Sequence, residues 1–426
     1  DIDISESTNR LIKDLYQKYS KNYLVATDTR NIRKNALFFS LKGAHFNGNT
    51  FAKKAIELGA SYAIIDEKSY EIKGKTILVN NVLKTLQALA NYHRKQLAIP
   101  IIGITGSNGK TTTKELLHSV LQTQFNTKAT LGNLNNHIGV PLTILSFTNK
   151  TEIGIVEMGA NHQKEIEFLC TICEPDLGYI TNFGKAHLEG FGGIEGVIKG
   201  KSELYTYLKE NNKISFVNVN DAIQVQLTTN LNSVLLNNTI ATSAIQPFLA
   251  VKYKDQVIDT HLVGAYNVDN LKAAISIGEY FTISQENIIS AIKNYIPTNN
   301  RSQIIKKKNN IILMDAYNAN PSSTMVALDN LNKTNHQKKT VILGDMFELG
   351  DYSTKEHQNI VDYCNTLHLD RCIFVGEAYS KTSASEKYEN FECLKDKIKQ
   401  SPFKNCYILI KGSRGMSLER LLEVID

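Results

Sequence analysis

Residues 103–112, which read Gly-Ile-Thr-Gly-Ser-Asn-Gly-Lys-Thr-Thr, constrain the fold of this chain more than any other stretch. An apolar, β-branched run at residues 101–105 leads into them, and a helical pattern follows over residues 110–124. A glycine-rich turn between a buried strand and a helix points backbone amides at the helix N-terminus, where phosphate binds well. Lys110 could reach the β- and γ-phosphates and the Thr111 hydroxyl could ligate Mg²⁺, so the stretch predicts a nucleoside-triphosphate loop.

The match to the general motif G-x-x-x-x-G-K-[ST] is not strict. Ile104 stands where the motif has its first glycine, and the nearest glycine upstream is Gly103. A turn that merely joins strand to helix is the alternative, but the Gly-Lys-Thr-Thr ending favours phosphate binding. The residues expected to bind the phosphates are Gly106, Ser107, Asn108, Gly109, Lys110, Thr111 and Thr112.

Apolar strand patterns alternate with helical patterns along the chain, which is typical of parallel α/β sheets. At 426 residues the chain is too long for one hydrophobic core. We predict three α/β domains, residues 1–98, 99–297 and 298–426, with the phosphate-loop sheet in the centre and a doubly wound sheet at the end. The predicted strands are 36–41, 62–65, 101–105, 153–156, 178–181, 311–314, 340–343, 372–375 and 407–410, and the predicted helices are 51–58, 82–96, 110–124 and 267–280.

Composition and charge exclude several classes of protein. The hydrophobic share of 42% and the charged share of 21% are ordinary for a globular protein. The net charge of +6 is spread thinly, and residues 306–308 are the longest run of lysines, so no nucleic-acid partner is expected. Because no stretch could span a membrane and no signal peptide opens the chain, we expect a soluble, cytoplasmic protein without a membrane partner.

Two of the six cysteines, Cys170 and Cys173, are spaced C-x-x-C, which could indicate redox or metal chemistry. No second C-x-x-C and no histidine pair completes a zinc set. We therefore expect buried or half-buried free thiols in a reducing compartment.

The phosphate loop resembles that of the Mur ligases, which build the peptide of bacterial cell-wall precursors; folylpolyglutamate synthase shares their superfamily. The missing first glycine fits this variant of the loop. Residues 131–141, Glu157 to Ala160, residues 315–321 and residues 343–350 resemble the Mur ligases that add D-alanyl-D-alanine. Residues 27–30 and 38–43 resemble the family's module for the UDP end of the substrate, although Asn47-Gly48-Asn49 replaces the frequent Asp-Gly-His step.

Glu157 ends a predicted strand beside the phosphate loop, where a carboxylate could hold Mg²⁺ or cap a helix. The resemblance implies the metal role. It also implies a second Mg²⁺ at His187 and at a carbamylated lysine, for which we favour Lys201 over Lys199; the alternative is a solvated helix lysine. The predicted metal ligands are therefore Thr111, Glu157, His187 and Lys201.

Further binding residues are implied by the resemblance. For the nucleotide, Asn267 and Asn270 would face adenine, Arg301 would contact the nucleotide, and Asp315 would hold the ribose hydroxyls. Asn267 alone would otherwise suggest a helix cap. The expected substrate-binding residues are Thr29, Arg30, Asn133, Asn135, Asn136, Tyr317 and Asn320, with Lys411 and Arg414 as weaker candidates for a dipeptide carboxylate.

The resemblance implies an ATP-dependent ligase that joins UDP-N-acetylmuramoyl-tripeptide to D-alanyl-D-alanine through an acyl phosphate, in peptidoglycan synthesis, and that acts as a monomer. ATP would bridge the second and third domains, so closure would precede chemistry. The expected catalytic residues are Lys110, Glu157, His187, Lys201 and Asn318. A folylpolyglutamate-type ligase and a non-catalytic ATP-binding partner protein are the alternatives.

Overall fold

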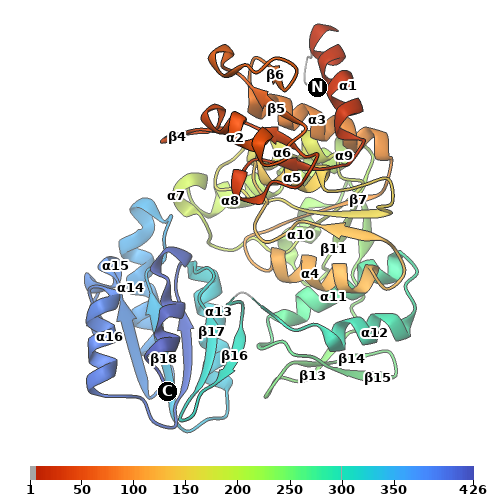
Figure 1. Cartoon of the computed structure of the whole chain (residues 1–426). Coiled ribbons are helices and arrows are strands. Elements are labelled where there is room, and N and C mark those ends of the chain that lie inside the picture. The colour runs from red at the N-terminus through yellow and green to blue at the C-terminus, as the bar shows by residue number, and fades with distance from the viewer. Residues whose placement is uncertain (1–5, 299) are drawn as a thin grey trace.

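The computed structural model describes residues 6–298 and 300–426 as an α/β protein built around separate sheets (Figure 1). At the N-terminus, parallel strands in the order β1-β2-β5-β6 pack against α1 and α3 on one face and α2 on the other. The elements of this N-terminal unit are α1 (Glu6–Tyr19), β1 (Val25–Ala26), β2 (Leu37–Phe39), β3 (Lys42–Gly43), β4 (Phe46–Asn47), α2 (Ala52–Glu57), β5 (Tyr62–Ile65), β6 (Thr76–Leu78) and α3 (Val82–Leu97).

The central unit contains a parallel sheet in the order β12-β11-β10-β7-β9-β8, followed by a small antiparallel sheet, β13-β14-β15. Its elements are β7 (Ile101–Thr105), α4 (Lys110–Leu121), β8 (Thr127–Ala129), α5 (Gly139–Leu145), β9 (Ile153–Glu157), α6 (Glu165–Cys173), β10 (Leu177–Ile180), α7 (Leu188–Phe191), α8 (Ile194–Lys201), α9 (Glu203–Glu210), β11 (Ile214–Val217), α10 (Ala222–Leu227), β12 (Asn232–Leu235), β13 (Ala241–Ala244), β14 (Ala250–Tyr253), β15 (Gln256–Asp259), α11 (Asn267–Tyr280) and α12 (Gln285–Asn294).

The C-terminal unit is a sheet in the order β16-β17-β21-β18-β19-β20, in which the edge strand β16 is antiparallel to β17 and the remaining pairs are parallel. Its elements are β16 (Gln303–Lys306), β17 (Ile311–Asp315), α13 (Pro321–Lys333), β18 (Lys339–Gly344), α14 (Ser353–Cys364), β19 (Arg371–Val375), α15 (Glu377–Ser380), β20 (Lys387–Tyr388), α16 (Phe391–Gln400) and β21 (Tyr407–Lys411).

Side chains of the central strands alternate between two cores, because successive residues of a strand point to opposite faces. Ile102 and Ile104 of β7 pack with α4 and α11. Ile101 of the same strand, with Val156 and Met158 at β9, packs on the side of α5, α6 and α9. Helices therefore cover both faces, and β7 lies inside the sheet with the phosphate loop at its carboxyl end.

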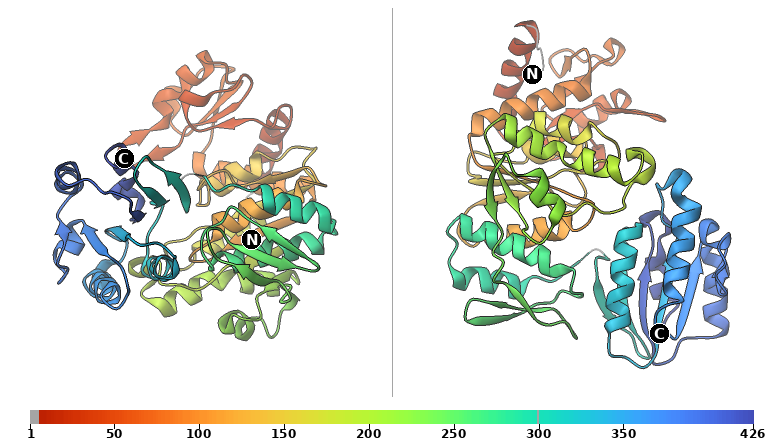
Figure 2. Two further views of the ribbon diagram at one scale, coloured as in Figure 1. Left: turned by 90° about the horizontal axis from the view of Figure 1, so that it is seen from below. Right: turned by 180° about the vertical axis from the view of Figure 1, so that it is seen from behind.

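The two outer units meet the central unit differently (Figure 2). Helix α3 of the N-terminal unit packs along α5 and α6 of the central unit. The C-terminal unit, blue in the figures, approaches the central unit near α7 and the phosphate loop. The phosphate loop thus lies where the C-terminal unit meets the central one.

The predicted α/β fold is confirmed, and strands 62–65 and 101–105 and helix 267–280 have the predicted bounds. The helix predicted over 110–124 ends at Leu121, because residues 122–124 form a turn. Helix α1 and the antiparallel strands β13–β15 were not predicted. The domain boundaries at 98 and 297 stay a prediction.

Among the residues that the structure describes, no helix combines the length and the apolar character that crossing a bilayer requires.

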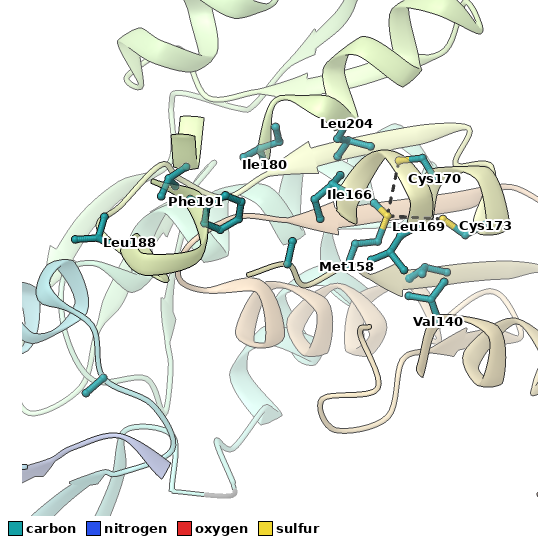
Figure 3. Close-up of a cluster of buried hydrophobic side chains, with 14 of the residues drawn as sticks. Val140, Met158, Ile166, Leu169, Cys170, Cys173, Ile180, Leu188, Phe191 and Leu204 are labelled. Atoms are coloured by element: carbon teal, nitrogen blue, oxygen red, sulfur yellow. Dashed lines mark hydrogen bonds between the residues drawn. The ribbon is translucent and has the colours of Figure 1, made fainter. Parts of the chain in front are cut away.

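The expected burial of the C-x-x-C pair is confirmed. Cys170 and Cys173 are free thiols in the core, and each Sγ contacts Sδ of Met158, at 3.9 and 3.8 Å (Figure 3). Burial raises the pKa of Cys173 to about 12 and that of Cys170 well above its usual value. Thiols so far from ionisation, packed against a thioether, are inert core residues rather than redox centres.

Candidate active site

The phosphate loop is braced by the segment that follows β10. The Ser107 hydroxyl donates to the Gly184 carbonyl at 2.9 Å, and the Asn108 amide donates to Oδ1 of Asn182 at 3.0 Å. The Thr181 hydroxyl donates to the Asn108 carbonyl at 2.5 Å. These bonds fix the loop backbone before any ligand binds, which is the preorganisation that an anion site needs.

Two glycines of the loop have no substitute. Gly106 has φ +141°, and a Cβ there would lie 1.8 Å from the Thr181 hydroxyl. Gly109 has φ +83°, and its Cβ would lie 2.6 Å from Oδ1 of Asn270. Positive φ and close backbone approach both require glycine, so the sequence pattern reflects a packing requirement as well as a ligand.

Lys110 and Thr111 open helix α4 beside Glu157. Nζ of Lys110 donates to the Gly106 carbonyl at 2.8 Å, so the side chain curls over the loop. The Thr111 hydroxyl donates to Oε1 of Glu157 at 2.6 Å, and Glu157 is fully buried at the end of β9. Burial lowers the pKa of Lys110, an effect that the charge of Glu157 opposes and that of Arg301 reinforces. A cation and an anion thus flank the place where a triphosphate would bind.

The segment 131–141 packs against Glu157. Nδ2 of Asn135 donates to Oε2 of Glu157 at 2.7 Å, while Asn136 accepts from the amides of Ile138 and Gly139 at the start of α5. Asn133 is exposed. Of the three predicted substrate-binding asparagines, Asn135 is therefore held by the carboxylate, Asn136 has a structural bond, and Asn133 faces solvent.

The two residues predicted for a second metal lie in different surroundings. Lys201, at the end of α8, is fully buried, donates to the Ala160 carbonyl at 3.4 Å and lies 5.2 Å from the Phe191 ring centre. Burial and the nearby Lys110 charge lower its pKa well below the usual lysine value. Lys199 is exposed, so the solvated-lysine alternative applies to Lys199 and is wrong for Lys201.

His187 contacts the carboxylate of Glu348 from the C-terminal unit, and this pairing lowers the pKa of Glu348. The backbone also connects the two units here, because the Glu189 amide donates to the Glu348 carbonyl at 3.3 Å. His187 is therefore placed at the junction between units.

Asn267 and Asn270 lie buried on α11 next to the phosphate loop. Nδ2 of Asn267 donates to the Val263 carbonyl, and Nδ2 of Asn270 donates to Oδ1 of Asn267. The Thr113 hydroxyl donates to Oδ1 of Asn270 at 3.0 Å, which joins α11 to α4. These bonds support the loop helix; contact with adenine stays a prediction.

On the C-terminal unit, the predicted nucleotide residues gather at the carboxyl ends of β17 and β21. The Arg301 guanidinium stacks on the Tyr317 ring at 3.5 Å, and Arg414 lies 5.2 Å from the same ring centre. Nζ of Lys411 lies 3.1 Å from Asp315 and donates to the Asn318 carbonyl at 3.0 Å. Asp315 is thus ion-paired, and ribose binding would have to share or replace that contact.

Asn320 connects the two halves of the site. Its Oδ1 accepts from the Ser323 amide and caps α13, while its Nδ2 donates to Oδ1 of Asn108 in the phosphate loop at 2.7 Å. Nearby, the Lys185 amide donates to the Ser322 hydroxyl at 2.6 Å. The C-terminal unit therefore contacts the phosphate loop directly.

The residues predicted for the UDP end lie apart from these contacts. Thr29 and Arg30 are in a short 3₁₀ turn (Thr29–Asn31), where Arg30 forms an exposed ion pair with Asp28 and lowers its pKa to about 2. Asn49 is buried and donates to Asp66, so the Asn-Gly-Asn step has a structural role in this unit.

Several site residues were not predicted from the sequence. Thr181 and Asn182 hold the phosphate loop, Lys114 lies 3.8 Å from Glu157, and Glu348 reaches His187 from the C-terminal unit. Lys114 left a sequence signal, since it follows Lys110 by four residues and so shares its helix face, and Glu348 lies in the stretch 343–350 that resembles the family, although no role was assigned to it. Thr181, Asn182 and Glu348 have their effect only through the tertiary fold.

The donor atoms decide which metal sites fit. Within residues 6–298 and 300–426, no three His, Cys, Asp or Glu side chains gather as a metal cluster. The Thr111 hydroxyl and Glu157 carboxylate are adjacent hard oxygen donors, which suits Mg²⁺ that keeps phosphate and water ligands. A protonated Lys201 would repel a cation, and a neutral amine is a poor ligand for Mg²⁺, which prefers oxygen, so the set of His187 and Lys201 suits Mg²⁺ only if the lysine is carbamylated.

Comparisons with known proteins match the chain from near its start to near its end. Residues 22–96 match the Mur ligase family catalytic domain, residues 104–278 the Mur ligase middle domain, and residues 300–410 the Mur ligase glutamate ligase domain.

A UDP-N-acetylmuramoyl-tripeptide–D-alanyl-D-alanine ligase of Bacillus subtilis is 33% identical over 94% of this chain and 92% of its own. A crystal structure of MurF from Acinetobacter baumannii aligns with TM-score 0.82 and 27% identity, over 96% of this chain and 97% of that one. MurF of Thermotoga maritima, solved in complex with ADP, aligns with TM-score 0.80 and 25% identity over 94% and 96%.

Proposed function

The chain belongs to the Mur ligase family, and from this premise we propose that it is the ATP-dependent ligase that adds D-alanyl-D-alanine to UDP-N-acetylmuramoyl-tripeptide in peptidoglycan synthesis. The relatives that carry this name align with all three units, including the N-terminal one. One observation carries the proposal: Glu157 is held between Thr111 of the phosphate loop and Asn135 of the segment 131–141. The phosphate loop and the segment that we assign to the peptide substrates therefore meet at a single carboxylate.

The chemistry follows from the poor reactivity of a carboxylate toward amines. Its oxygen attacks the γ-phosphorus of ATP, the bond to the β-phosphate oxygen breaks, and an acyl phosphate and ADP form. The amine of the dipeptide then attacks the acyl carbon, the amide bond forms, and inorganic phosphate leaves as the amine loses its proton. Both steps develop negative charge on oxygens next to the loop.

This chain's own residues would stabilise that charge. Lys110, curled over the loop, would turn toward the β- and γ-phosphates, and the loop amides would donate to their oxygens. Asn318, exposed at the end of β17, would face the transferred phosphoryl group. Thr111 and Glu157 would hold Mg²⁺, which when bound supplies positive charge that polarises the phosphoryl group.

We assign the remaining contacts as follows. Asn267, Asn270, Arg301 and Asp315 would bind the nucleoside, and Arg301 is already close enough to lower the pKa of Lys110. Thr29 and Arg30 would meet the UDP end, and Asn133, Asn135, Asn136, Tyr317 and Asn320 the peptide and dipeptide. The contact of Asn320 with Asn108 supports a site that closes between the second and third units.

Lys201 would be carbamylated, and with His187 would hold a second Mg²⁺. Burial lowers the pKa of the Lys201 amine, which favours the neutral form whose lone pair attacks CO₂; the C–N bond forms and one proton is released. Native mass spectrometry after incubation with ¹³C-bicarbonate should show one labelled CO₂ on the wild type and none on Lys201→Ala. Label retained on the variant would contradict the assignment.

The cellular setting follows from the reaction. The product is a precursor of the wall that sets cell shape and permits division, and its nucleotide substrates are cytoplasmic. We propose that the enzyme works there as a monomer.

The deciding experiment measures phosphate release with ATP, Mg²⁺ and UDP-N-acetylmuramoyl-tripeptide, carrying either diaminopimelate or lysine, with and without D-alanyl-D-alanine. Release should require the dipeptide, and the product mass should rise by one dipeptide less one water. Release that persists without the dipeptide, or that appears only with folate substrates, would refute the proposal.

A further inference from the structure

We propose that Lys114 is a positioning residue. It joins helix α4 to the segment 130–136 and so keeps the Asn135 side chain oriented toward Glu157. The inference rests on the proposed ligase function, which assigns Asn133, Asn135 and Asn136 of that segment to the tripeptide and dipeptide substrates. Lys114 is not among the residues to which the family resemblance assigns a role. None of the hydrogen bonds that hold the phosphate loop to the segment after β10 involves it.

Lys114 is a buried lysine between two parts of the site. Its side chain is 2% exposed, and it lies one helical turn beyond Lys110 on the same face of α4. Nζ donates to the Gly132 carbonyl at 3.1 Å and lies 3.8 Å from Oε1 of Glu157. One ammonium group therefore joins a loop carbonyl to the buried carboxylate.

The segment 130–136 is also hydrogen-bonded to Glu157 and its neighbours. The Glu157 amide donates to the Thr130 hydroxyl at 2.9 Å, and Nδ2 of Asn135 donates to Oε2 of Glu157 at 2.7 Å. The Gly159 amide donates to the Asn135 carbonyl at 2.8 Å, and a Cβ on Gly159 would meet the Asn135 amide at 2.8 Å. These three bonds hold the segment close to β9 at Thr130 and at Asn135, on either side of its tip.

Between Thr130 and Asn135 the chain is exposed, with Leu131 the most exposed large apolar side chain of the stretch at 75%. The bond to the Gly132 carbonyl is therefore the anchor at the exposed tip of this turn. Because buried charges are costly unless paired, the ammonium also balances Glu157 before a ligand arrives. Removing Lys114 should free the tip and loosen the orientation of Asn135.

The two lysines of α4 should then separate in function. Lys110 donates to the Gly106 carbonyl inside the phosphate loop, whereas Lys114 donates to Gly132 outside it. The loop itself is held by Thr181 and Asn182, which do not involve Lys114. Nucleotide binding should therefore survive the loss of Lys114, while use of the tripeptide substrate should not.

The test compares Lys114→Met with Lys128→Met, a matched control whose lysine is exposed on β8. Calorimetric titration without added metal should give ADP affinities within about threefold of wild type for both variants. Hydrogen exchange should rise in peptides covering 130–136 and at the Gly159 amide in K114M only. In the ligase assay, K114M should raise KM for the UDP-tripeptide by about tenfold or more while KM for ATP changes by less than about threefold.

ADP binding and hydrogen exchange are measured without any peptide substrate, so they test the role of Lys114 even if the assigned reaction is wrong. Wild-type exchange over 130–136 in K114M, or a loss of ADP affinity as large as the change in tripeptide KM, would overturn the proposal. If K114M does not fold, Lys114→Gln takes its place, because its polar but uncharged side chain is one atom shorter than lysine and so gives up both the bond to the Gly132 carbonyl and the charge beside Glu157. Lys114→Gln is also expected to raise KM for the UDP-tripeptide more than KM for ATP. Equal changes in the two KM values would overturn the proposal.

Discussion

The N-terminal and C-terminal units join the central unit through junctions of opposite construction. At the α3 junction, side chains of α1 and α3 donate to backbone carbonyls of the central unit: Tyr19 to Leu145, and Asn91 and Arg94 to residues 171–174. At the loop junction, each contact includes a residue that is itself expected to bind ligand: Asn320 donates to Asn108, and His187, a predicted metal ligand, contacts Glu348.

The difference indicates what each junction is for. A carbonyl acceptor is fixed by the backbone, and buried donors left without it would cost free energy, so the α3 junction should behave as one folded body. Side-chain contacts at the loop junction can be exchanged for contacts with phosphate or metal. We therefore expect the first junction to govern stability and the second to govern catalysis.

The largest effect should come from Arg94→Ala at the α3 junction. The guanidinium is buried and donates to the carbonyls of Ile99, Cys173 and Glu174 and to Asp176 at 2.7 Å. Breaking a buried charged network should lower the free energy of unfolding by about 3–5 kcal/mol. Urea denaturation measures this, with Lys95→Ala, an exposed lysine 3.9 Å from Glu174, as the control. A loss no larger than that of K95A would remove the distinction between the junctions.

His93 should make the α3 junction sensitive to acid. Its Nε2 donates to the Phe147 carbonyl at 2.8 Å and its Nδ1 faces the Tyr16 hydroxyl at 3.0 Å. Burial lowers its pKa to about 4, so between that value and its unfolded pKa near 6.5 the unfolded chain binds more protons. Stability should therefore fall as pH drops through this window, by up to about 3 kcal/mol, and remain constant above it.

The measurement is the difference in unfolding free energy between wild type and His93→Gln at successive pH values. Below about pH 6.5 the unfolding free energy of the wild type should fall relative to that of the variant, since glutamine at position 93 cannot take up a proton. A difference independent of pH would show that His93 is not held neutral at the junction.

At the loop junction, Asn320→Ser should affect activity more than folding. Serine can still cap α13, so stability should change by less than about 1 kcal/mol. The shorter side chain loses the bond to Asn108, which should lower kcat/KM for ATP by up to about tenfold. Steady-state kinetics and thermal unfolding would show whether activity falls while stability is kept. A loss of unfolding free energy as large as that of R94A would contradict the distinction between the two junctions.

The smallest effect is expected for Lys185→Met, which removes the ion pair with Glu356 across the loop junction. Nζ and Oε1 are 3.2 Å apart, and the lysine side chain is 47% exposed. Although the Glu356 side chain is 8% exposed, water reaches the ammonium and salt screens the pair, so we expect it to contribute about 1 kcal/mol or less and KM for ATP to change about twofold or less. Wild-type enzyme in high salt should reproduce the variant, and a tenfold change would show that this pair controls closure.

Much of the fold could be read from the sequence because its signals are local. The β-branched run at residues 101–105 and the helix at 267–280 carry their own periodicity and have the predicted bounds. Helix α1 was missed although its buried residues Ile12, Leu15 and Tyr19 recur at helical spacing, and strand β13 was missed because it is exposed and has no apolar face to signal it. The candidate site divides in the same way: Gly106 to Thr112 were predicted, whereas Thr181, Asn182 and Glu348 were not.

The sequence by itself determined the phosphate loop, since glycine at φ +141° and +83°, followed by lysine and threonine, is needed wherever such a loop lies. It also distinguished Glu157 as the carboxylate that ends a buried strand. Only the tertiary structure decided that Lys201 is buried while Lys199 is exposed, that Lys114 reaches a loop carbonyl, and that Asn320 meets Asn108. The physical reason is that desolvation and hydrogen bonding depend on neighbours far away in the chain, whereas backbone conformation is set largely by adjacent residues.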